Sequence, residues 1–404
     1  MLSFNFYCPT RYIFGKDAMD FFPDALREQN AKKIMVVHYG ESRTMSTPER
    51  AVNEVRKALI SNGFDYLEFT GVVPNPVLSK VMEGIEVCRE YEPDLILAIG
   101  GGSAIDTAKA IAAGVKLGKD EDLWNDYIFP KNRFKKAVPV AVVLTIPAAG
   151  SEMSFGICIT DEKTRTKRYT GGECLIPKFC ISNPEFCYSL PPYQTACGVY
   201  DIVSHLTERY FVPYPDEDLS DHMIEAIIRT LLIHGPKVIA EPENYGSRSQ
   251  IMWAGTIAHN KILEMGRTHG DWASHDMGHE LSSFYNMTHG ASLAIITPAW
   301  MKYVWKRVSP ENRGKFLQYA RNVFNVTDIG HDREDDVVEE MIRRLEQWTV
   351  SLGLPTRLSE AGIGDECFEE MAENAMRGRK NVGTGWGIFL LHKEDVVEVY
   401  KLAK

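Results

Sequence analysis

The chain has 404 residues, of which 44% are apolar and 25% are charged, and its formal net charge is −10. These values are typical of a globular protein with two domains, and the acidic balance argues against nucleic acid as a partner, because phosphate contacts need clustered lysine and arginine. The apolar run at 138–149 is shorter than the ~20 residues that cross a bilayer. The N-terminus has no signal-peptide pattern, and no two of the eight cysteines have CxxC spacing. We therefore expect a cytoplasmic protein that binds neither membrane nor nucleic acid.

Strand-like and helix-like segments alternate through the first part of the chain. In chain order we expect strands at 34–37, 66–69, 94–99 and 138–146, separated by helices at 49–61, 79–90 and 104–115. Such alternation predicts a parallel sheet with helices on both faces. The pattern from 158 to 181 is more typical of a hairpin.

Beyond the prolines at 184, 191 and 192, strand signals nearly vanish. Hydrophobic periodicity predicts helices at 192–211, 219–234, 247–265, 271–285, 291–304, 313–324, 335–352 and 367–376. We therefore expect two domains, an α/β domain over residues 1–187 and an all-helical domain over residues 188–404.

A glycine-rich loop, GGGS at 100–103, directly follows the strand expected at 94–99. It leads into a helix whose N-terminal N–H groups suit a pyrophosphate, and Asp106 in the first turn can stabilise the helix dipole or reach a ligand. A tight turn without a ligand is the alternative. Ile105 occupies the third glycine position of a G-x-G-x-x-G fingerprint, and the loop follows the third expected strand instead of the first.

A second set of small and hydroxyl residues, TIPAAGSE at 145–152, follows the next expected strand. Sheets of this class bind ligands at the C-terminal ends of their strands, so this segment is a second candidate for ligand contact. An ordinary turn with a capping serine is the alternative.

Five of the eleven histidines fall between residues 259 and 289. His275 and His279 are four residues apart and share a face of the expected helix, and His289 starts the next helical run. Upstream, Asp201 and His205 have the same spacing on a largely apolar helix, where a buried carboxylate and imidazole need a partner charge or a metal. Two helices that each offer such a pair can complete a four-ligand site.

The donor atoms of this cluster are nitrogens and oxygens, which favours Fe²⁺, Zn²⁺, Mn²⁺ or Co²⁺. Any one of these histidines alone is more often a hydrogen-bonded core or surface residue, so the metal prediction depends on the cluster. A zincin metalloprotease is excluded, because the residue four beyond His279 is Ser283. His38, after the first expected strand, is expected to be structural.

With these residues in view, the chain resembles the iron-containing (group III) alcohol dehydrogenases, and within them the butanol dehydrogenase and broad-range aldehyde reductase branch. The resemblance covers nearly the whole chain and rests on an ordered set of motifs: PTRYIFG at 9–15, PNP at 74–76, GGGSAID at 100–106, TIPAAGSE at 145–152, LPP at 190–192, GVYDIVSHLTE at 198–208, HDMGH at 275–279 and HG at 289–290. It implies a dehydroquinate-synthase-like fold of the α/β plus all-α class. Such a fold has an N-terminal dinucleotide-binding domain, a C-terminal helical metal-binding domain and an active site in the cleft between them.

The resemblance also implies roles for individual residues. The expected ligands of the metal, Fe²⁺ or Zn²⁺ in first place, are Asp201, His205, His275 and His289. His279 matches an additional histidine near the nicotinamide, and it is the candidate catalytic residue for moving a proton. The expected coenzyme contacts are Gly101, Gly102 and Ser103 at the pyrophosphate, Thr145 and Ser151 on the nicotinamide side, Lys167 at the ribose, and also Asp106.

The segment YGESR at 39–43 departs from the glycine-rich YGGGS that the branch often has there. It is expected to meet the adenosine ribose through Gly40, Glu41 and Ser42. Glu41 can bond a 2′-hydroxyl and repel a 2′-phosphate, whereas Ser42 and Arg43 can bind a 2′-phosphate. Both NAD and NADP therefore remain open as the coenzyme.

The function that the resemblance implies is metal-dependent hydride transfer between NAD(P)H and a primary alcohol or aldehyde, such as butanol or butanal, in a homodimer. A lyase or other NAD-using enzyme on the same fold is one alternative, and the absence of an obvious basic cluster for a phosphorylated substrate argues against it. A non-catalytic metal- or nucleotide-binding protein is the other. Retention of both the phosphate loop and the full ligand set argues against that alternative.

Overall fold

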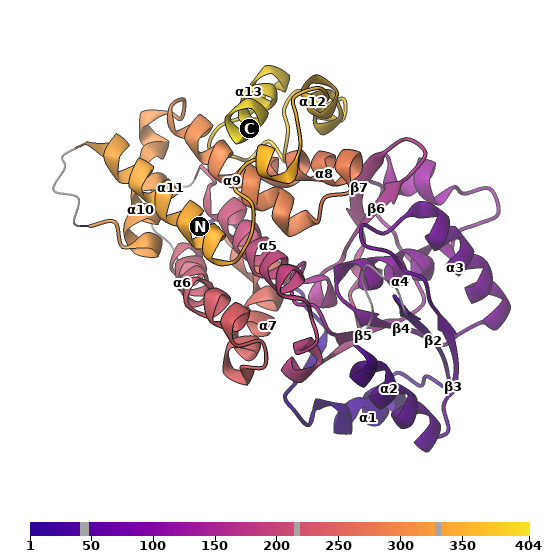
Figure 1. Cartoon of the computed structure of the whole chain (residues 1–404). Helices are drawn as coiled ribbons and strands as arrows, with labels where there is room; N and C mark the ends of the chain where they lie inside the picture. The colour runs from indigo at the N-terminus through magenta and orange to yellow at the C-terminus, as the bar shows by residue number, and fades with distance from the viewer. Residues whose placement is uncertain (41–47, 214–218, 328–332) are drawn as a thin grey trace. The chain divides into compact units, whose positions relative to one another are not determined.

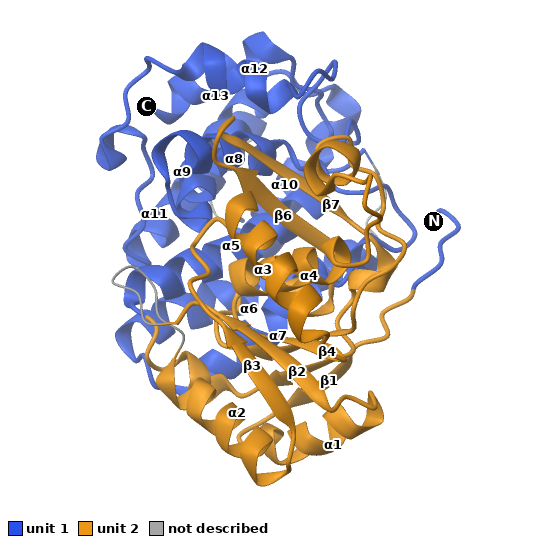
Figure 2. Cartoon of the chain, turned by 90° about the vertical axis from the view of Figure 1, so that its right-hand side faces the viewer, with its two compact units in different colours: residues 1–6, 191–404 blue, residues 7–190 orange. Residues whose placement is uncertain are grey.

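The structure is a computed structural model that describes residues 1–40, 48–213, 219–327 and 333–404. The chain divides into two compact units (Figure 2). One comprises Tyr7–Leu190, and the other comprises Pro191–Lys404 together with Met1–Phe6. The predicted domain limits, with a boundary between residues 187 and 188, remain a prediction.

The unit formed by Tyr7–Leu190 is built on a six-stranded, all-parallel sheet (Figure 1). Its strands in spatial order are β1 (Arg11–Phe14), β8 (Phe179–Ser182), β5 (Val140–Leu144), β4 (Leu95–Gly100), β2 (Lys33–His38) and β3 (Asp65–Phe69). The predicted parallel sheet is therefore confirmed. A separate antiparallel hairpin consists of β6 (Gly156–Asp161) and β7 (Thr166–Gly171).

Two strands differ from the sequence-based expectation. β8 was expected within a hairpin, but it lies between β1 and β5 in the main sheet, where all four of its residues are buried. β1 was not expected at all. It is a short edge strand whose end residues, Arg11 and Phe14, are exposed, so the apolar run that identifies an interior strand is missing.

Helices cover both faces of this sheet. On one face, α1 (Phe22–Glu28) and α2 (Glu49–Ser61) share a core with alternate strand residues such as Ile34 and Leu97. On the other face, α4 (Gly102–Gly114) packs on β4 and against α3 (Leu78–Tyr91). A Cβ on Gly84 would lie 2.3 Å from Ile111, which shows how closely α3 and α4 approach.

The strand order creates a reversal point between β2 and β4. From β2 the chain moves outward to β3, and it then returns to place β4 on the other side of β2. In open parallel sheets, ligands bind at the C-terminal ends of the strands at such a point. The loops after β2 and β4 begin there, and the second of them is the glycine-rich loop.

The second unit is helical. Its long helices are α5 (Pro192–Tyr210), α6 (Leu219–Ala240), α7 (Tyr245–His259), α8 (Ala273–Tyr285), α9 (His289–Trp305), α10 (Pro310–Phe324), α11 (Glu334–Ser351), α12 (Phe368–Met376) and α13 (Lys393–Ala403). α9 is buried along almost its whole length and packs against α5, α8 and α13. No helix within the described part of the chain combines the length and the apolar character that a membrane span requires.

Two helices of this unit differ from their predicted limits. α6 was expected to end at residue 234, before Pro236, but it continues through that proline. Proline removes one helical hydrogen bond, and the buried Leu231, Gly235 and Val238 keep the segment packed on the core. α13 was not expected; it buries Val396, Val399 and Tyr400 on one side.

Candidate metal centre and coenzyme loop

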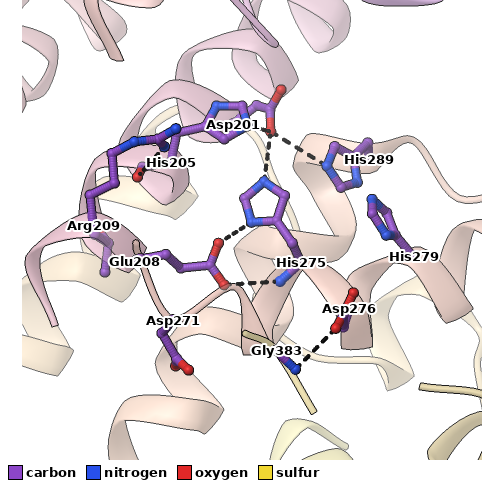
Figure 3. A network of polar contacts seen from close by, with 12 residues as sticks. Asp201, His205, Glu208, Arg209, Asp271, His275, Asp276, His279, His289 and Gly383 are labelled. Carbon is purple, nitrogen blue, oxygen red and sulfur yellow. Dashed lines mark hydrogen bonds and ion pairs between the residues drawn. The ribbon is translucent and has the colours of Figure 1, made fainter. Parts of the chain in front are cut away.

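Three helices bring the four predicted metal ligands together around one oxygen atom (Figure 3). The Oδ1 atom of Asp201 lies 3.9 Å from Nε2 of His205, 3.8 Å from Nε2 of His275 and 3.6 Å from Nε2 of His289. One ligand atom from each of Asp201, His205 and His275 lies within 4.8 Å of the other two, so these three residues could hold a metal ion. These three side chains are buried, whereas the side chain of His289, at the start of α9, is 23% exposed.

The hydrogen bonds of His275 fit a metal at this centre. Its backbone N–H donates to Oε1 of Glu208 over 3.0 Å, and its ring Nδ1 contacts Oε2 of the same carboxylate. Because a carboxylate accepts hydrogen bonds, Nδ1 carries the proton and Nε2 keeps its lone pair. Nε2 is buried and makes no hydrogen bond with any described residue, which is the state expected of a metal-binding nitrogen.

Burial and neighbouring positive groups also favour neutral imidazole at His205. Desolvation lowers the pKa of His205 well below its usual value, and His259, His275 and Arg209 add to the effect. The neutral form is the one that binds a metal.

Burial, together with Glu208 and Asp276, raises the pKa of Asp271 well above that of a free carboxyl group.

His279 lies beside this group on α8. Its ring stacks on that of His289 with 5.1 Å between centroids, and its Nδ1 lies 3.2 Å from Nη2 of Arg377. The remaining two histidines of the sequence cluster, His259 and His269, are not proposed ligands. The ring of His259 is 4.6 Å from that of His205 and also contacts Arg209, whereas His269 is exposed and pairs with Glu264.

The glycine-rich loop packs closely against the first turn of α4 and the segment that follows β5. Gly100 has a φ of +157°, and a Cβ there would lie 2.6 Å from the Cβ of Ala104. A Cβ on Gly101 would lie 2.6 Å from the Cβ of Ile146. No side chain caps the N-terminus of α4 at Gly101, so the first N–H groups of this helix remain suited to an anion such as a pyrophosphate.

Tyr39, which the sequence analysis did not select, lies against this loop. Its phenol is buried and hydrogen-bonds Ser103, and burial raises its pKa to about 12. Tyr39 follows β2 and Ser103 follows β4, so the contact joins the two loops at the reversal point of the sheet. An aromatic residue directly after a strand was a possible signal in the sequence for a role at this site. The contact with Ser103 could not be predicted, because it depends on which strands are neighbours in the sheet.

Asp106 and Ser151 are joined to each other. The Ser151 hydroxyl donates to Oδ1 of Asp106 over 2.7 Å, and the backbone N–H of Cys158 donates to Oδ2 over 2.9 Å. Burial raises the pKa of Asp106. Lys109, one turn further along α4, donates to backbone oxygens of Ser151 and Ser154. Lys109 was not among the predicted site residues, because in the sequence it is one residue within an expected helix.

The other predicted coenzyme residues lie at the ends of strands or in nearby loops. Gly40 has a φ of +74° and donates its N–H to His38. Thr145 follows β5, and its buried hydroxyl makes no hydrogen bond with the described residues. Lys167, on β7, donates to Oδ1 of Asn75 over 3.1 Å. Glu41, Ser42 and Arg43 lie outside the described residues.

Comparison with known proteins gives full-length relatives. At the sequence level, NADH-dependent butanol dehydrogenase A of Clostridium acetobutylicum is 36% identical over 401 residues, 99% of each chain. NADPH-dependent aldehyde reductase YqhD of Escherichia coli is 36% identical over 364 residues, 90% of each chain. At the structural level, NADH-dependent butanol dehydrogenase A of Thermotoga maritima superposes with a TM-score of 0.91 at 33% identity, covering 100% of this chain and 99% of that one.

Family models match both units of the chain. The model described as iron-containing alcohol dehydrogenase matches residues 9–184, and the C-terminal model of the Fe-containing alcohol dehydrogenase family matches residues 195–404. These matches, the relatives and the α/β plus helical architecture agree, and the chain belongs to the iron-containing alcohol dehydrogenase family.

Proposed function

We propose that this protein is a metal-dependent oxidoreductase that transfers a hydride between NAD(P)H and a primary alcohol or aldehyde, such as butanol or butanal. The observation that carries the proposal is the set of three imidazoles around Oδ1 of Asp201 in a chain whose full-length relatives are named butanol dehydrogenases and an aldehyde reductase. Asp201, His205, His275 and His289 are the proposed ligands, and Fe²⁺ or Zn²⁺ is the proposed metal.

The bound groups supply two parts of the chemistry: the metal is a Lewis acid for the substrate oxygen, and the nicotinamide carries the hydride. The residues of the chain supply the rest. Glu208 fixes the tautomer of His275, and the low pKa of His205 keeps that ring neutral. Reduction of an aldehyde adds a hydride to carbon and a proton to oxygen, and His279 or a water chain is the candidate for handling the proton.

For the coenzyme, we propose that the N-terminus of α4 binds the pyrophosphate through Gly101, Gly102 and Ser103. The uncapped N–H groups of this helix support that assignment. Further proposed contacts are Gly40, Glu41, Ser42, Asp106, Thr145, Ser151 and Lys167. Because Asp106 and Ser151 bond each other, they also hold the turn after β5 in place.

The remaining assignments are at the level of the whole chain. We propose residues 1–187 as the dinucleotide-binding domain and residues 188–404 as the metal-binding domain, in a cytoplasmic homodimer. A lyase on the same fold is not favoured, because the full-length relatives carry the names of alcohol and aldehyde oxidoreductases.

The test is an assay of the full chain purified without oxygen. Butanal reduction is measured with NADH and with NADPH, after chelation and after re-addition of Fe²⁺, Zn²⁺ or Mn²⁺. We expect oxidation of one or both coenzymes that stops on chelation and returns with metal, and the ratio of the two rates identifies the coenzyme. Failure to oxidise either coenzyme with any of these metals would overturn the proposed function and support the non-catalytic alternative.

A further inference from the structure

Arg377 joins two residues of α8 that sequence analysis did not connect to it. It follows the last residue of α12 and adopts a left-handed backbone conformation, with a φ of +54°. Its side chain is only 4% exposed. Nη1 lies 3.0 Å from Oδ1 of Asp276, and Nη2 lies 3.2 Å from Nδ1 of His279. One guanidinium therefore bridges a carboxylate and the proposed catalytic histidine.

The bridge determines which nitrogen of His279 carries the proton. A guanidinium group can only donate hydrogen bonds, so Nδ1 must accept this one with its lone pair. A neutral imidazole has one N–H and one lone pair, and the proton is then on Nε2. The ring of His279 stacks on that of His289, with 5.1 Å between the centroids, so His279 lies beside a proposed metal ligand.

Arg377 is held firmly enough to impose this choice. Asp276, its carboxylate partner, also accepts hydrogen bonds from Nη2 of Arg379 over 2.6 Å and from the backbone N–H of Gly383 over 3.0 Å. Gly383 has a φ of +76°, and a Cβ there would lie 2.4 Å from the carbonyl oxygen of Asp271. The segment that carries Arg377 is thus held against the start of α8 by hydrogen bonds and close packing.

We propose that Arg377 is a positioning residue that fixes His279 as the Nε2–H tautomer, so that His279 presents a hydrogen-bond donor to an oxygen atom bound at the centre. This inference rests on the proposed function and narrows it. A neutral His279 with Nδ1 engaged by Arg377 donates a hydrogen bond and keeps its proton, and the proton added to the product oxygen arrives through water.

The experiment measures directly which ring nitrogen of His279 carries the proton. The zinc-loaded full chain is labelled with ¹⁵N-histidine, and the ring signals of His279 are assigned with a His279→Gln variant. Wild-type protein is expected to show a protonated Nε2 and an unprotonated Nδ1. Arg377→Met should lose this fixed pattern. The matched control is Arg379→Met, which also removes a guanidinium from Asp276 but does not contact His279, and it should keep the pattern.

Turnover provides a second readout. Arg377→Met is expected to lower kcat by roughly 10- to 100-fold, the usual effect of losing a partner that orients a functional side chain, with the KM for coenzyme nearly unchanged. Arg379→Met should have a smaller effect. If Arg377→Met does not fold, Arg377→Lys replaces it, because one ammonium group cannot bridge Asp276 and His279 as the planar fork does.

The outcomes separate this inference from the proposed function. A proton on Nδ1 in wild-type protein, or an unchanged His279 pattern in the folded Arg377 variant, overturns the positioning role even if the enzyme reduces aldehydes. If the pattern is lost in that variant but no aldehyde is reduced by the wild type, the positioning stands and the oxidoreductase assignment fails.

Discussion

Glu208 contacts His275 at two points, with Oε1 accepting the backbone N–H and Oε2 contacting ring Nδ1. The two residues lie on different helices, α5 and α8. One carboxylate therefore sets both the position of the peptide and the tautomer of the ring. Asp201 and His205 lie on the same helix as Glu208, so α5 both contributes proposed ligands and orients one that α8 provides.

Replacement of Glu208 by glutamine should weaken metal binding without changing the ligand set. The amide would have to accept from two N–H groups while it carries N–H groups of its own, so one contact is lost. We expect the affinity for Zn²⁺ to fall roughly 10- to 100-fold, measured by competition with a chelator. Glu369→Gln on α12 is the matched control, because that side chain is 75% exposed. Equal affinities of the two variants would refute the orienting role of Glu208.

His275→Ala and His279→Ala should separate metal binding from turnover. His275 provides a proposed ligand atom, so its loss should remove bound metal and activity together. His279 is not a proposed ligand, and its Nδ1 hydrogen-bonds Arg377, so its loss should preserve the metal and lower kcat. Metal content by elemental analysis and the rate of butanal reduction are measured on the same samples. His269→Ala is the control, because His269 is exposed. Full metal occupancy in His275→Ala would contradict the ligand assignment.

Gly101→Ala should damage the coenzyme loop. The new Cβ would lie 2.6 Å from the Cβ of Ile146 and 3.1 Å from its carbonyl oxygen, so the loop must move. We expect a loss of roughly 1–3 kcal/mol in unfolding free energy and weaker binding of NADH and NADPH, measured by thermal melting and by coenzyme fluorescence.

The matched substitution for that experiment is Gly314→Ala. A Cβ at Gly314 meets nothing within 4 Å, and the residue lies inside α10. Alanine there should raise stability by about 0.5–1 kcal/mol and leave coenzyme binding unchanged. Coenzyme binding by Gly101→Ala at the wild-type level would show that the loop does not approach the pyrophosphate.

The buried Lys109 should make stability depend on pH in alkaline solution. Desolvation lowers its pKa to about 8 from the usual lysine value of 10.5. Between these values the folded chain has released a proton that the unfolded chain still holds, so this residue makes stability rise with pH. Below about pH 8 both states are protonated and the full cost of burying the charge remains.

The measurement compares thermal midpoints of wild type and Lys109→Met from about pH 7 to about pH 10.5. The wild type should gain stability relative to the variant as pH rises through this window. Lys116→Met, at an exposed position two residues beyond the end of α4, is the control and should follow the wild type. Parallel curves for wild type and Lys109→Met would rule out a depressed pKa for Lys109.

Local patterns in the sequence determined much of the architecture. Apolar runs of β-branched residues predicted the interior strands β2, β4 and β5, and periodic apolar positions predicted most of the helices, because burial on one face leaves a repeat in the sequence. The spacing of Asp201 and His205, and of His275 and His279, placed each pair on one face of a helix for the same reason. The family followed from the order of the motifs.

The tertiary structure alone decided the relationships between distant segments. The edge strand β1 and the position of β8 depend on which strands pair, and a short, half-exposed strand has no distinctive repeat. The contacts of Glu208 with His275, of Tyr39 with Ser103 and of Arg377 with His279 join residues far apart in the chain. A side-chain hydrogen bond depends on direction and on distances of a few ångströms, and these are set by the packing of helices and strands, which periodicity does not encode.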